Sequence, residues 1–361
     1  MAYSNILVTG GAGFIGSNFI HYVIANIPGI NIVNLDLLTY AGCLENLYDV
    51  SQSPRYTFYH GDICNADLLR QLMSDHQIDA IVHFAAESHV DRSIYDASPF
   101  LRTNILGTHA LLEAARNAWK FEPYNDQDFR FHHISTDEIY GSLEPNSPKS
   151  TEKSPYLPNS PYAASKAASD HLVRAYHATY GLPVTITNSS NNYGPYQFPE
   201  KLIPLCINNA IRELPIPVYG DGGNLRDWIQ VEDHCAGIWA AITKGQPGSS
   251  YNLGGGNQVA NIDLIKMVCA ILDERSPRGF GKKYEDLVIF VQDRPGHDRR
   301  YALDTTKALN ELGWRPYVSL NEGLQRTVDW YLANWDWVEK IWKKSNYSNW
   351  VNDHYNQRGD K

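Results

Sequence analysis

The chain has 361 residues, of which 43% are hydrophobic and 20% charged, and its formal net charge is -9. This composition is typical of a globular protein, and the length allows one large domain or two unequal ones. The acidic balance argues against a general affinity for nucleic acid or anionic membranes, so we expect neither as a partner.

Short β-rich runs alternate with helical patterns in the first half of the chain. The runs lie at residues 5–10, 30–36, 56–63, 80–86, 129–136 and 183–190, and helical patterns lie at 13–26, 105–119 and 160–180. Apolar runs with little alternation, separated by helices, indicate a parallel sheet that is covered on both faces. Right-handed crossovers then predict an α/β fold with a doubly wound, Rossmann-type parallel sheet.

The regular alternation stops after about residue 190, where segments rich in Pro and Gly begin. We therefore predict a first domain over residues 1–190, to which the chain returns around 225–255. A second, smaller α/β domain over residues 191–330 is interleaved with it. The tail, 331–361, carries several Trp and Tyr residues and is expected to be helical and to pack against the body.

A glycine-rich segment, VTGGAGFIG, places Gly10, Gly13 and Gly16 between the first strand and the first helix. Glycines there permit a tight turn and a close approach of the backbone to a diphosphate at the helix N-terminus. Asp36 ends the second strand, where a carboxylate binds a ribose 2′-hydroxyl and repels a 2′-phosphate. No Arg follows it, so NAD is favoured over NADP. Asp62 is equally a candidate for the adenine and for a capping role.

Tyr162 and Lys166 are four residues apart in a helical segment, so their side chains share a face. A Lys ammonium stabilises a phenolate and lowers a pKa of about 10 toward neutrality. Such a Tyr can take a proton from a sugar hydroxyl while hydride leaves the same carbon. Because this pair follows a dinucleotide site and the fifth strand, it indicates a catalytic role.

Two adjacent acids, Asp137 and Glu138, follow an apolar strand in FHHISTDEIYGS. Adjacent strand residues point to opposite faces, so both acids reach one substrate only if the strand ends first. We expect a loop to begin at Thr136. Two neighbouring carboxylates can act as acid and base if their pKa values are pushed apart, for example by burial. The alternative is that they cap a turn.

Several motifs together resemble the extended short-chain dehydrogenase/reductase superfamily and, within it, the dTDP-glucose 4,6-dehydratase family. These motifs are TGGAGFIGSN, FAAESHVDRS, STDEIYG, SPYAASKAASDHLV, SNNYGPYQFPEKLIP, RDWIQVEDH and DRPGHDRRYA. The resemblance implies that NAD oxidises the C4 carbon of a nucleotide-linked glucose. Glu138 would then remove the C5 proton, and Asp137 would protonate the C6 hydroxyl, which leaves as water. Hydride return to C6 would give a 4-keto-6-deoxy sugar, and Thr136 would bind the O4 hydroxyl beside Tyr162.

The resemblance also implies two sets of binding residues. The set for NAD is Gly10, Gly13, Phe14, Ile15, Gly16, Asp36, Thr39, Asp62, Ile63, Ala85, Thr103, Tyr162, Lys166 and Asn192. The set for the sugar nucleotide is Ser88, Thr136, Asn191, Lys201, Leu202, Pro217, Val218, Tyr219, Arg226, Asn261, Arg294 and His297. The last two belong to the basic cluster DRPGHDRR, whose guanidinium groups suit a diphosphate. We assign no role to His89, His132 and His133, because packed neutral histidines are common near strand ends.

Other functions remain open at this point. A UDP-sugar 4-epimerase or a decarboxylase of the same superfamily keeps the glycines and the Tyr–Lys pair, but an epimerase would carry small or hydroxyl residues at 136–138. A UDP-glucose 4,6-dehydratase is harder to exclude, whereas a GDP-mannose dehydratase would carry basic residues for NADP after the second strand. A silent NAD-binding scaffold would have no chemical need for Thr136, Asp137, Glu138, Tyr162 and Lys166 together.

The location and assembly of the protein follow from other features. The first basic residue is Arg55, which argues against a signal peptide, and no apolar run is long enough to cross a bilayer, so we expect a cytoplasmic protein. Five scattered cysteines without a C-x-x-C pair predict neither a zinc site nor a disulfide framework. The resemblance implies a homodimer in which helices 105–119 and 162–180 pack against their mates.

Overall fold

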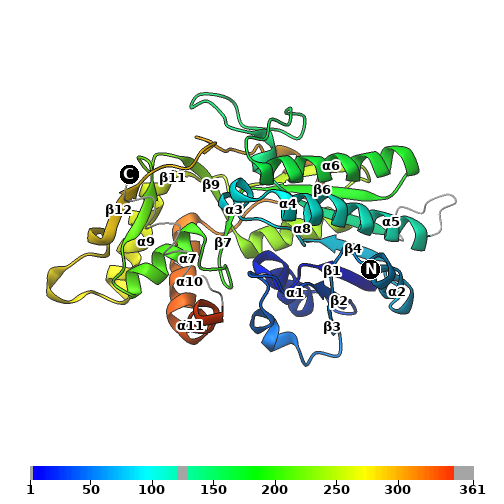
Figure 1. The fold of residues 1–361 in the computed structure, drawn as a ribbon, viewed down its shortest axis with the longest axis horizontal. Coiled ribbons are helices and arrows are strands. Elements are labelled where there is room, and N and C mark those ends of the chain that lie inside the picture. Colours follow the sequence, from blue (N-terminus) through cyan, green and yellow to red (C-terminus); the bar gives the residue numbers. More distant parts are fainter. Residues whose placement is uncertain (1–2, 120–128, 345–361) are drawn as a thin grey trace.

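The computed structural model describes residues 3–119 and 129–344, which form two unequal parts (Figure 1). The larger part contains a seven-stranded parallel sheet in the order β10-β6-β5-β4-β1-β2-β3. This order confirms the predicted doubly wound, Rossmann-type sheet. Its strands are β1 (Asn5–Thr9), β2 (Asn31–Asp36), β3 (Tyr56–His60), β4 (Ala80–His83), β5 (Arg130–Thr136), β6 (Val184–Ser189) and β10 (Ser249–Leu253).

Helices cover both faces of this sheet, which explains why its strands are buried along nearly their whole length, except for the edge strand β3. In β1, Ile6 and Val8 pack with helices on one face, whereas Leu7 packs with helices on the other. The first face carries α1 (Phe14–Asn26) and α8 (Val231–Lys244), and the second carries α2 (Ala66–Asp75), α5 (Thr108–Ala118) and α6 (Pro161–Tyr180). Two short helices, α3 (Val90–Tyr95) and α4 (Ser98–Phe100), follow β4.

The smaller part has a separate apolar core formed by two small sheets and the helices beside them. The chain enters it after β6, returns to the large sheet through α8 and β10, and then leaves it again (Figure 1). Its strands are β7 (Asn191–Tyr193), β8 (Ile216–Tyr219), β9 (Leu225–Gln230), β11 (Gln258–Ala260) and β12 (Val288–Val291). Its helices are α7 (Leu202–Ile211), α9 (Asn261–Arg275), α10 (Leu320–Ala333) and α11 (Trp335–Lys344).

The aromatic residues of α10 and α11 pack against the body of the protein. The Tyr196 ring lies 4.8 Å from the Trp330 ring and 6.0 Å from the Trp337 ring, measured between centroids. The Trp337 indole N–H donates to Asn46 Oδ1 at 3.0 Å, which ties α11 to the 3-10 helix Leu44–Val50 that follows β2. The predicted tail also includes residues 345–361, which lie outside the described residues.

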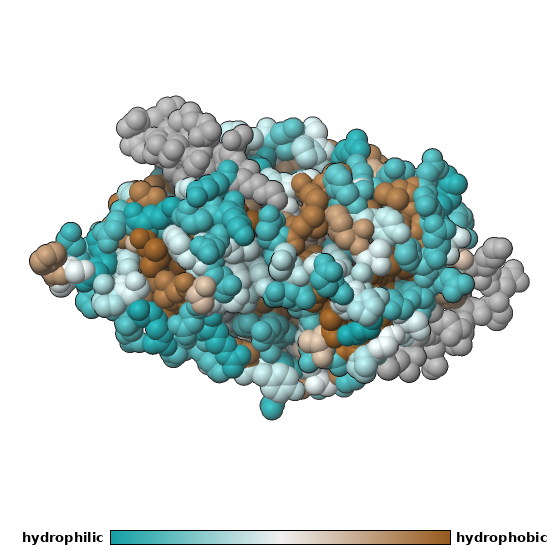
Figure 2. Space-filling model, turned by 90° about the horizontal axis from the view of Figure 1, so that it is seen from below, coloured by the Kyte–Doolittle hydropathy of each residue, from teal (hydrophilic) through white to brown (hydrophobic). Residues whose placement is uncertain are grey.

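None of the helices in the described residues is long and apolar enough to cross a bilayer. On the face shown in Figure 2, hydrophobic residues form separate clusters among hydrophilic ones.

Candidate active site

The glycine-rich turn between β1 and α1 forms a cradle at the carboxyl edge of the sheet. Gly10 has φ +73°, and a Cβ there would lie 2.5 Å from the Ala85 backbone nitrogen, so this position requires glycine. A Cβ on Gly16 would lie 2.3 Å from the Gly10 carbonyl oxygen. A Cβ on Gly13 would meet only that same oxygen, at 3.3 Å, so the cradle is open there. Since α1 begins at Phe14, its free N–H groups and the open glycine fit a diphosphate.

Two carboxylates lie at the carboxyl ends of β2 and β3, since Asp36 is the last residue of β2 and Asp62 comes two residues after β3. Asp36 accepts hydrogen bonds from the backbone N–H groups of Ala12 at 2.9 Å and Leu38 at 2.7 Å, which fixes its position at the end of β2. Asp62 accepts from the Cys64 N–H at 2.8 Å and from the Arg102 guanidinium at 2.7 Å. The contact with the Cys64 N–H is the kind that a capping Asp makes at a turn, which is one of the two roles considered for Asp62. Both acids also line the pocket described next.

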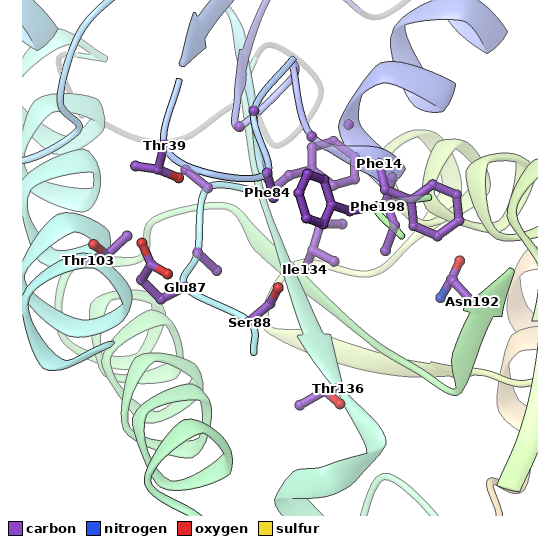
Figure 3. A pocket seen from close by; sticks show the side chains of 18 of the residues that line it. Phe14, Thr39, Phe84, Glu87, Ser88, Thr103, Ile134, Thr136, Asn192 and Phe198 are labelled. Atoms are coloured by element: carbon purple, nitrogen blue, oxygen red, sulfur yellow. The ribbon is translucent and has the colours of Figure 1, made fainter. Parts of the chain in front are cut away.

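A pocket of about 320 Å³ joins the cradle to the carboxyl end of β5 (Figure 3). Every residue predicted to contact NAD lines this pocket. Of the predicted sugar-nucleotide residues, Ser88, Thr136, Asn191 and Lys201 line it, whereas the others lie outside its lining. Figure 3 shows Thr39 and Thr103 on one side of the cavity, Phe14, Phe198 and Asn192 on the other, and Thr136 at the end of its strand.

The two adjacent acids reach the pocket because β5 ends at Thr136. A 3-10 turn, Asp137–Tyr140, follows in place of the expected loop. The Thr136 hydroxyl caps this turn, accepting from the Glu138 N–H at 3.3 Å, so the cap is not either carboxylate. The same hydroxyl lies 3.3 Å from Asp137 Oδ1. Both carboxyl groups line the pocket together with Tyr162 and Lys166.

The environments of the two acids differ. Burial and then the charge of Glu138 raise the pKa of Asp137 well above its ordinary value, and Asp137 Oδ2 has no hydrogen-bond partner within the described residues. Burial also raises the pKa of Glu138, but the charges of Arg294, Arg226 and Lys201 oppose that effect. Asp137 is therefore the carboxyl that keeps its proton more strongly, and Glu138 is the more easily ionised one.

Tyr162 and Lys166 both lie buried on α6. The Lys166 ammonium donates to the Ile134 carbonyl at 2.7 Å, and burial lowers its pKa to about 8. Burial and then Glu138 raise the pKa of Tyr162, so the expected lowering by Lys166 is wrong for this structure. The reason is geometric, since β5 holds the ammonium while the phenol lies among carboxyl groups.

The remaining predicted residues surround a second polar region, next to α3. Asp91 accepts from the Tyr219 hydroxyl at 2.8 Å and from the Arg294 guanidinium at 3.0 Å. Arg294 Nε and Asn261 Oδ1 are buried and have no hydrogen-bond partner within the described residues. Arg226 is also buried, 4.3 Å above the centre of the Tyr301 ring. Orphaned donors and acceptors of this kind fit a polar ligand.

The other predicted residues near that region come from several elements. Pro217 and Val218 lie on β8, Leu202 begins α7, and the His297 ring Nδ1 donates to Asp293 Oδ1 at 2.6 Å. The basic cluster DRPGHDRR does not gather as one patch. Arg299 pairs with Asp221 at 2.8 Å, and Arg300 donates to Gln258 at 2.8 Å.

Sequence reasoning missed several residues that line the pocket. Among them is Glu200, a buried acid that accepts from the Tyr40 hydroxyl at 2.9 Å and lies 3.4 Å from His89 Nε2. Glu87 and Phe198 also line the cavity. Glu200 could have been found from its place directly before Lys201 in a predicted binding motif, whereas nothing local marks Phe198.

The parallel sheet, the glycine cradle and the Tyr–Lys helix define the extended short-chain dehydrogenase/reductase class. Comparisons with known proteins narrow this class. A family described as GDP-mannose 4,6 dehydratase matches residues 7–327. A dTDP-glucose 4,6-dehydratase from Shigella flexneri is 52% identical over 98% of this chain and 99% of its own length.

Solved structures agree with this assignment. The crystal structure of DesIV, a dTDP-glucose 4,6-dehydratase from Streptomyces venezuelae with NAD and TYD bound, is 48% identical with a TM-score of 0.85, covering 93% of this chain and 99% of that one. A UDP-glucose 4-epimerase from Thermotoga maritima is 30% identical with a TM-score of 0.80, covering 92% and 99%. The chain therefore belongs to the dTDP-glucose 4,6-dehydratase family.

Proposed function

We propose that this protein is a hydro-lyase that uses NAD to convert dTDP-glucose into dTDP-4-keto-6-deoxyglucose, a reaction of deoxysugar biosynthesis. The observation that carries this proposal is the turn Thr136–Asp137–Glu138, which opens into the same pocket as Tyr162 and Lys166. An epimerase needs no acid and base at C5 and C6, so these two carboxyl groups favour dehydration. The identity to the Shigella flexneri and Streptomyces venezuelae dehydratases supports dTDP-glucose as the substrate.

The cradle would hold the cofactor through this chain's own groups. Gly10, Gly13 and Gly16 would contact the diphosphate at the start of α1, and Asp36 would accept from the adenosine ribose. Tyr162 and Lys166 would lie at the nicotinamide end. When bound, NAD accepts a hydride from C4 of the sugar and returns it to C6.

The acids would divide the dehydration between them. Tyr162, in its phenolate form, would take the proton of the C4 hydroxyl, with Thr136 bound to the same oxygen. Glu138, the more easily ionised acid, would remove the C5 proton once C4 is a ketone. Asp137, whose pKa is raised well above its ordinary value, would donate its proton to the departing C6 hydroxyl.

The smaller part would bind the rest of the substrate. Arg226, Arg294, His297 and Lys201 would contact the diphosphate, and Leu202, Pro217, Val218, Tyr219 and Asn261 would line the nucleoside pocket. Ser88 and Asn191 would contact the sugar. This division assigns the cofactor to residues 1–190 with the returning α8 and β10, and the sugar nucleotide to the interleaved region 191–330.

We further propose a cytoplasmic homodimer in which α5 and α6 of each subunit pack against their mates. Exposed apolar side chains at Leu101 and Leu106, in the helical segment that leads into α5, support an interface there. Sedimentation velocity at working concentration tests this proposal, and a monomer would contradict it.

The test of the reaction is incubation with dTDP-glucose that carries deuterium at C4, with UDP-glucose and GDP-mannose as controls. Mass spectrometry follows the loss of water, and NMR locates the deuterium. We expect loss of water with deuterium at C6. Faster turnover of UDP-glucose would indicate a UDP-glucose 4,6-dehydratase. An unchanged mass with a galactose-configured product would indicate an epimerase, and no turnover with NAD bound would favour a silent scaffold.

A further inference from the structure

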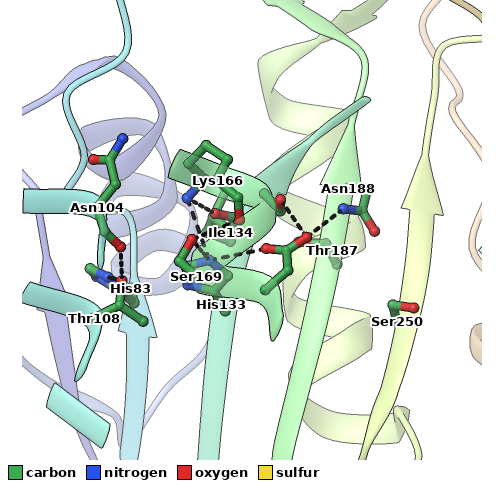
Figure 4. A network of polar contacts seen from close by, with 12 residues as sticks. His83, Asn104, Thr108, His133, Ile134, Lys166, Ser169, Thr187, Asn188 and Ser250 are labelled. Carbon is green, nitrogen blue, oxygen red and sulfur yellow. Dashed lines mark hydrogen bonds and ion pairs between the residues drawn. The ribbon is translucent and has the colours of Figure 1, made fainter. Parts of the chain in front are cut away.

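A buried polar network surrounds Lys166 (Figure 4). It contains His133, which was assigned no role from the sequence, and Asp170, one helical turn after Lys166 on α6. Lys166 is 5% exposed, and the side chains of His133 and Asp170 are fully buried. A buried ammonium and a buried carboxylate are each costly unless an opposite charge lies nearby. Lys166 and Asp170 can supply that charge to one another.

The His133 imidazole stands between the two charged groups. Its Nε2 lies 3.4 Å from Lys166 Nζ and 3.3 Å from Asp170 Oδ1. Burial lowers the pKa of His133 to about 4, so the ring is neutral and separates the ammonium from the carboxylate by a single polar atom. Figure 4 shows Lys166 directly beside His133 and Ser169, with Asn188 approaching from β6.

The other contacts of Asp170 are made by neutral groups. Asp170 Oδ2 accepts from the Ser135 hydroxyl at 2.9 Å, the Tyr156 hydroxyl at 3.1 Å and the Asn188 amide at 3.4 Å. Arg174, the nearest guanidinium on α6, donates to the Tyr156 hydroxyl at 2.9 Å instead of to this carboxylate. Burial raises the pKa of Asp170, but His133, the charge of Lys166 and the Ser135 hydrogen bond oppose that effect, so the pKa is lowered.

We propose that Asp170 is a positioning residue whose buried carboxylate, acting by its charge across the His133 ring and not through a hydrogen-bond relay, keeps Lys166 in its ammonium form in the pocket. The proposal rests on the catalytic role proposed for Lys166. Burial is the main influence on the pKa of Lys166 and lowers it, and the charge of Asp170 opposes that effect. The other titratable groups around the network are His83 on β4, Tyr140, Tyr156, Tyr162 and Arg174, with Asp137 and Glu138 on the substrate side.

The variant Asp170→Asn removes the charge and keeps the shape of the side chain. Without that charge, the pKa of Lys166 falls, so Lys166 loses its proton at a lower pH. We expect the loss of kcat at alkaline pH to begin about one to two pH units lower than in the unmodified protein. Asp170 also raises the pKa of Tyr162, so the acidic limb of the profile moves in the same direction. A uniform loss of kcat at every pH would overturn the proposal.

A second readout does not depend on turnover. Brief labelling with acetic anhydride, followed by peptide mass spectrometry, measures the neutral-amine fraction of Lys166, which lines the pocket. The labelling midpoint should fall by about one to two pH units in Asp170→Asn. It should not move in Asp221→Asn, which removes an exposed carboxylate that pairs with Arg299. An unmoved midpoint in Asp170→Asn would refute the proposal. A shifted midpoint in a protein that does not convert dTDP-glucose would refute only the proposed function.

A double variant keeps the proposal testable if Asp170→Asn fails to fold. Removing one member of a buried charge pair leaves the other uncompensated, whereas removing both is much less costly. Lys166→Met combined with Asp170→Asn should therefore restore folding and most of the thermal midpoint. Equal loss of folding in the single and double variants would mean that Asp170 acts only through its hydrogen bonds.

Discussion

Replacing Glu138 with Gln separates the proposed first step from the elimination. Gln keeps the size of the side chain but cannot remove the C5 proton. A general base contributes about 10²–10⁴-fold to a rate, so we expect kcat to fall by that factor. The activation free energy would then rise by about 3–5 kcal/mol. The substitution also removes one negative charge near Arg294, Arg226 and Lys201. The site then becomes more favourable to an anionic diphosphate, so KM should not rise.

The assay combines steady-state kinetics with a single-turnover experiment. In Glu138→Gln, C4 oxidation persists while elimination is blocked, so the near-ultraviolet absorbance of the reduced cofactor should build up and remain. Glu311→Gln is the matched control, because Glu311 accepts from the Tyr251 hydroxyl at 2.9 Å and does not line the pocket. A kcat within about threefold of the unmodified value would refute the assignment of Glu138 as the base.

Three further predictions concern the cofactor and stability. Asp36→Asn should weaken NAD binding about tenfold by calorimetry, because an amide oxygen cannot accept from the N–H groups and the ribose as a carboxylate does. Trp337→Phe removes the hydrogen bond to Asn46, so it should lower the unfolding free energy by about 1 kcal/mol. It should also reduce NAD retention, because the Asn46 amide donates to the Ala12 carbonyl in the cradle. Unchanged retention would contradict this link. Burial lowers the pKa of His234 to about 3, so the unfolded chain binds more protons below about pH 6.5 and stability is lost as pH falls. His234→Gln should therefore lose about 2 kcal/mol less than the unmodified protein between pH 7 and about pH 5 in urea titrations.

The large sheet could be predicted because the apolar runs of its buried strands can be recognised in the sequence. Its strands carry runs of buried β-branched and other apolar residues, and the glycine turn and the Asp36 carboxylate stand at fixed places relative to them. The smaller part gave no such signal, since its strands are three to six residues long and their partners are far apart in sequence, as when β12 pairs with β8. Its pairings depend on tertiary packing that local pattern does not encode.

The candidate site was predictable where chemistry depends on residue type and spacing, as for Tyr162 and Lys166. It was not predictable where a side chain's partner is set by packing. The spacing of that pair suggested that the ammonium would lower the pKa of the phenol, yet the ammonium bonds to the Ile134 carbonyl. Likewise, His133 looks like an ordinary core histidine in the sequence, and only the fold places it between Lys166 and Asp170.

The opposite roles proposed for Asp137 and Glu138 depend on the smaller part of the protein. Both acids lie in one turn, Asp137 buried and Glu138 partly buried, so burial alone would raise both pKa values. The difference arises because Arg294, Arg226 and Lys201, which all follow β6 in the chain, lower the pKa of Glu138, whereas for Asp137 the lowering by Arg226 is opposed by Glu138 and Asp227, which raise it. Loosening the contact between the two parts would remove these cations and make the two acids more alike. The proposed division into acid and base is therefore produced by the packing of the smaller part against the sheet, and not by the turn that carries the acids.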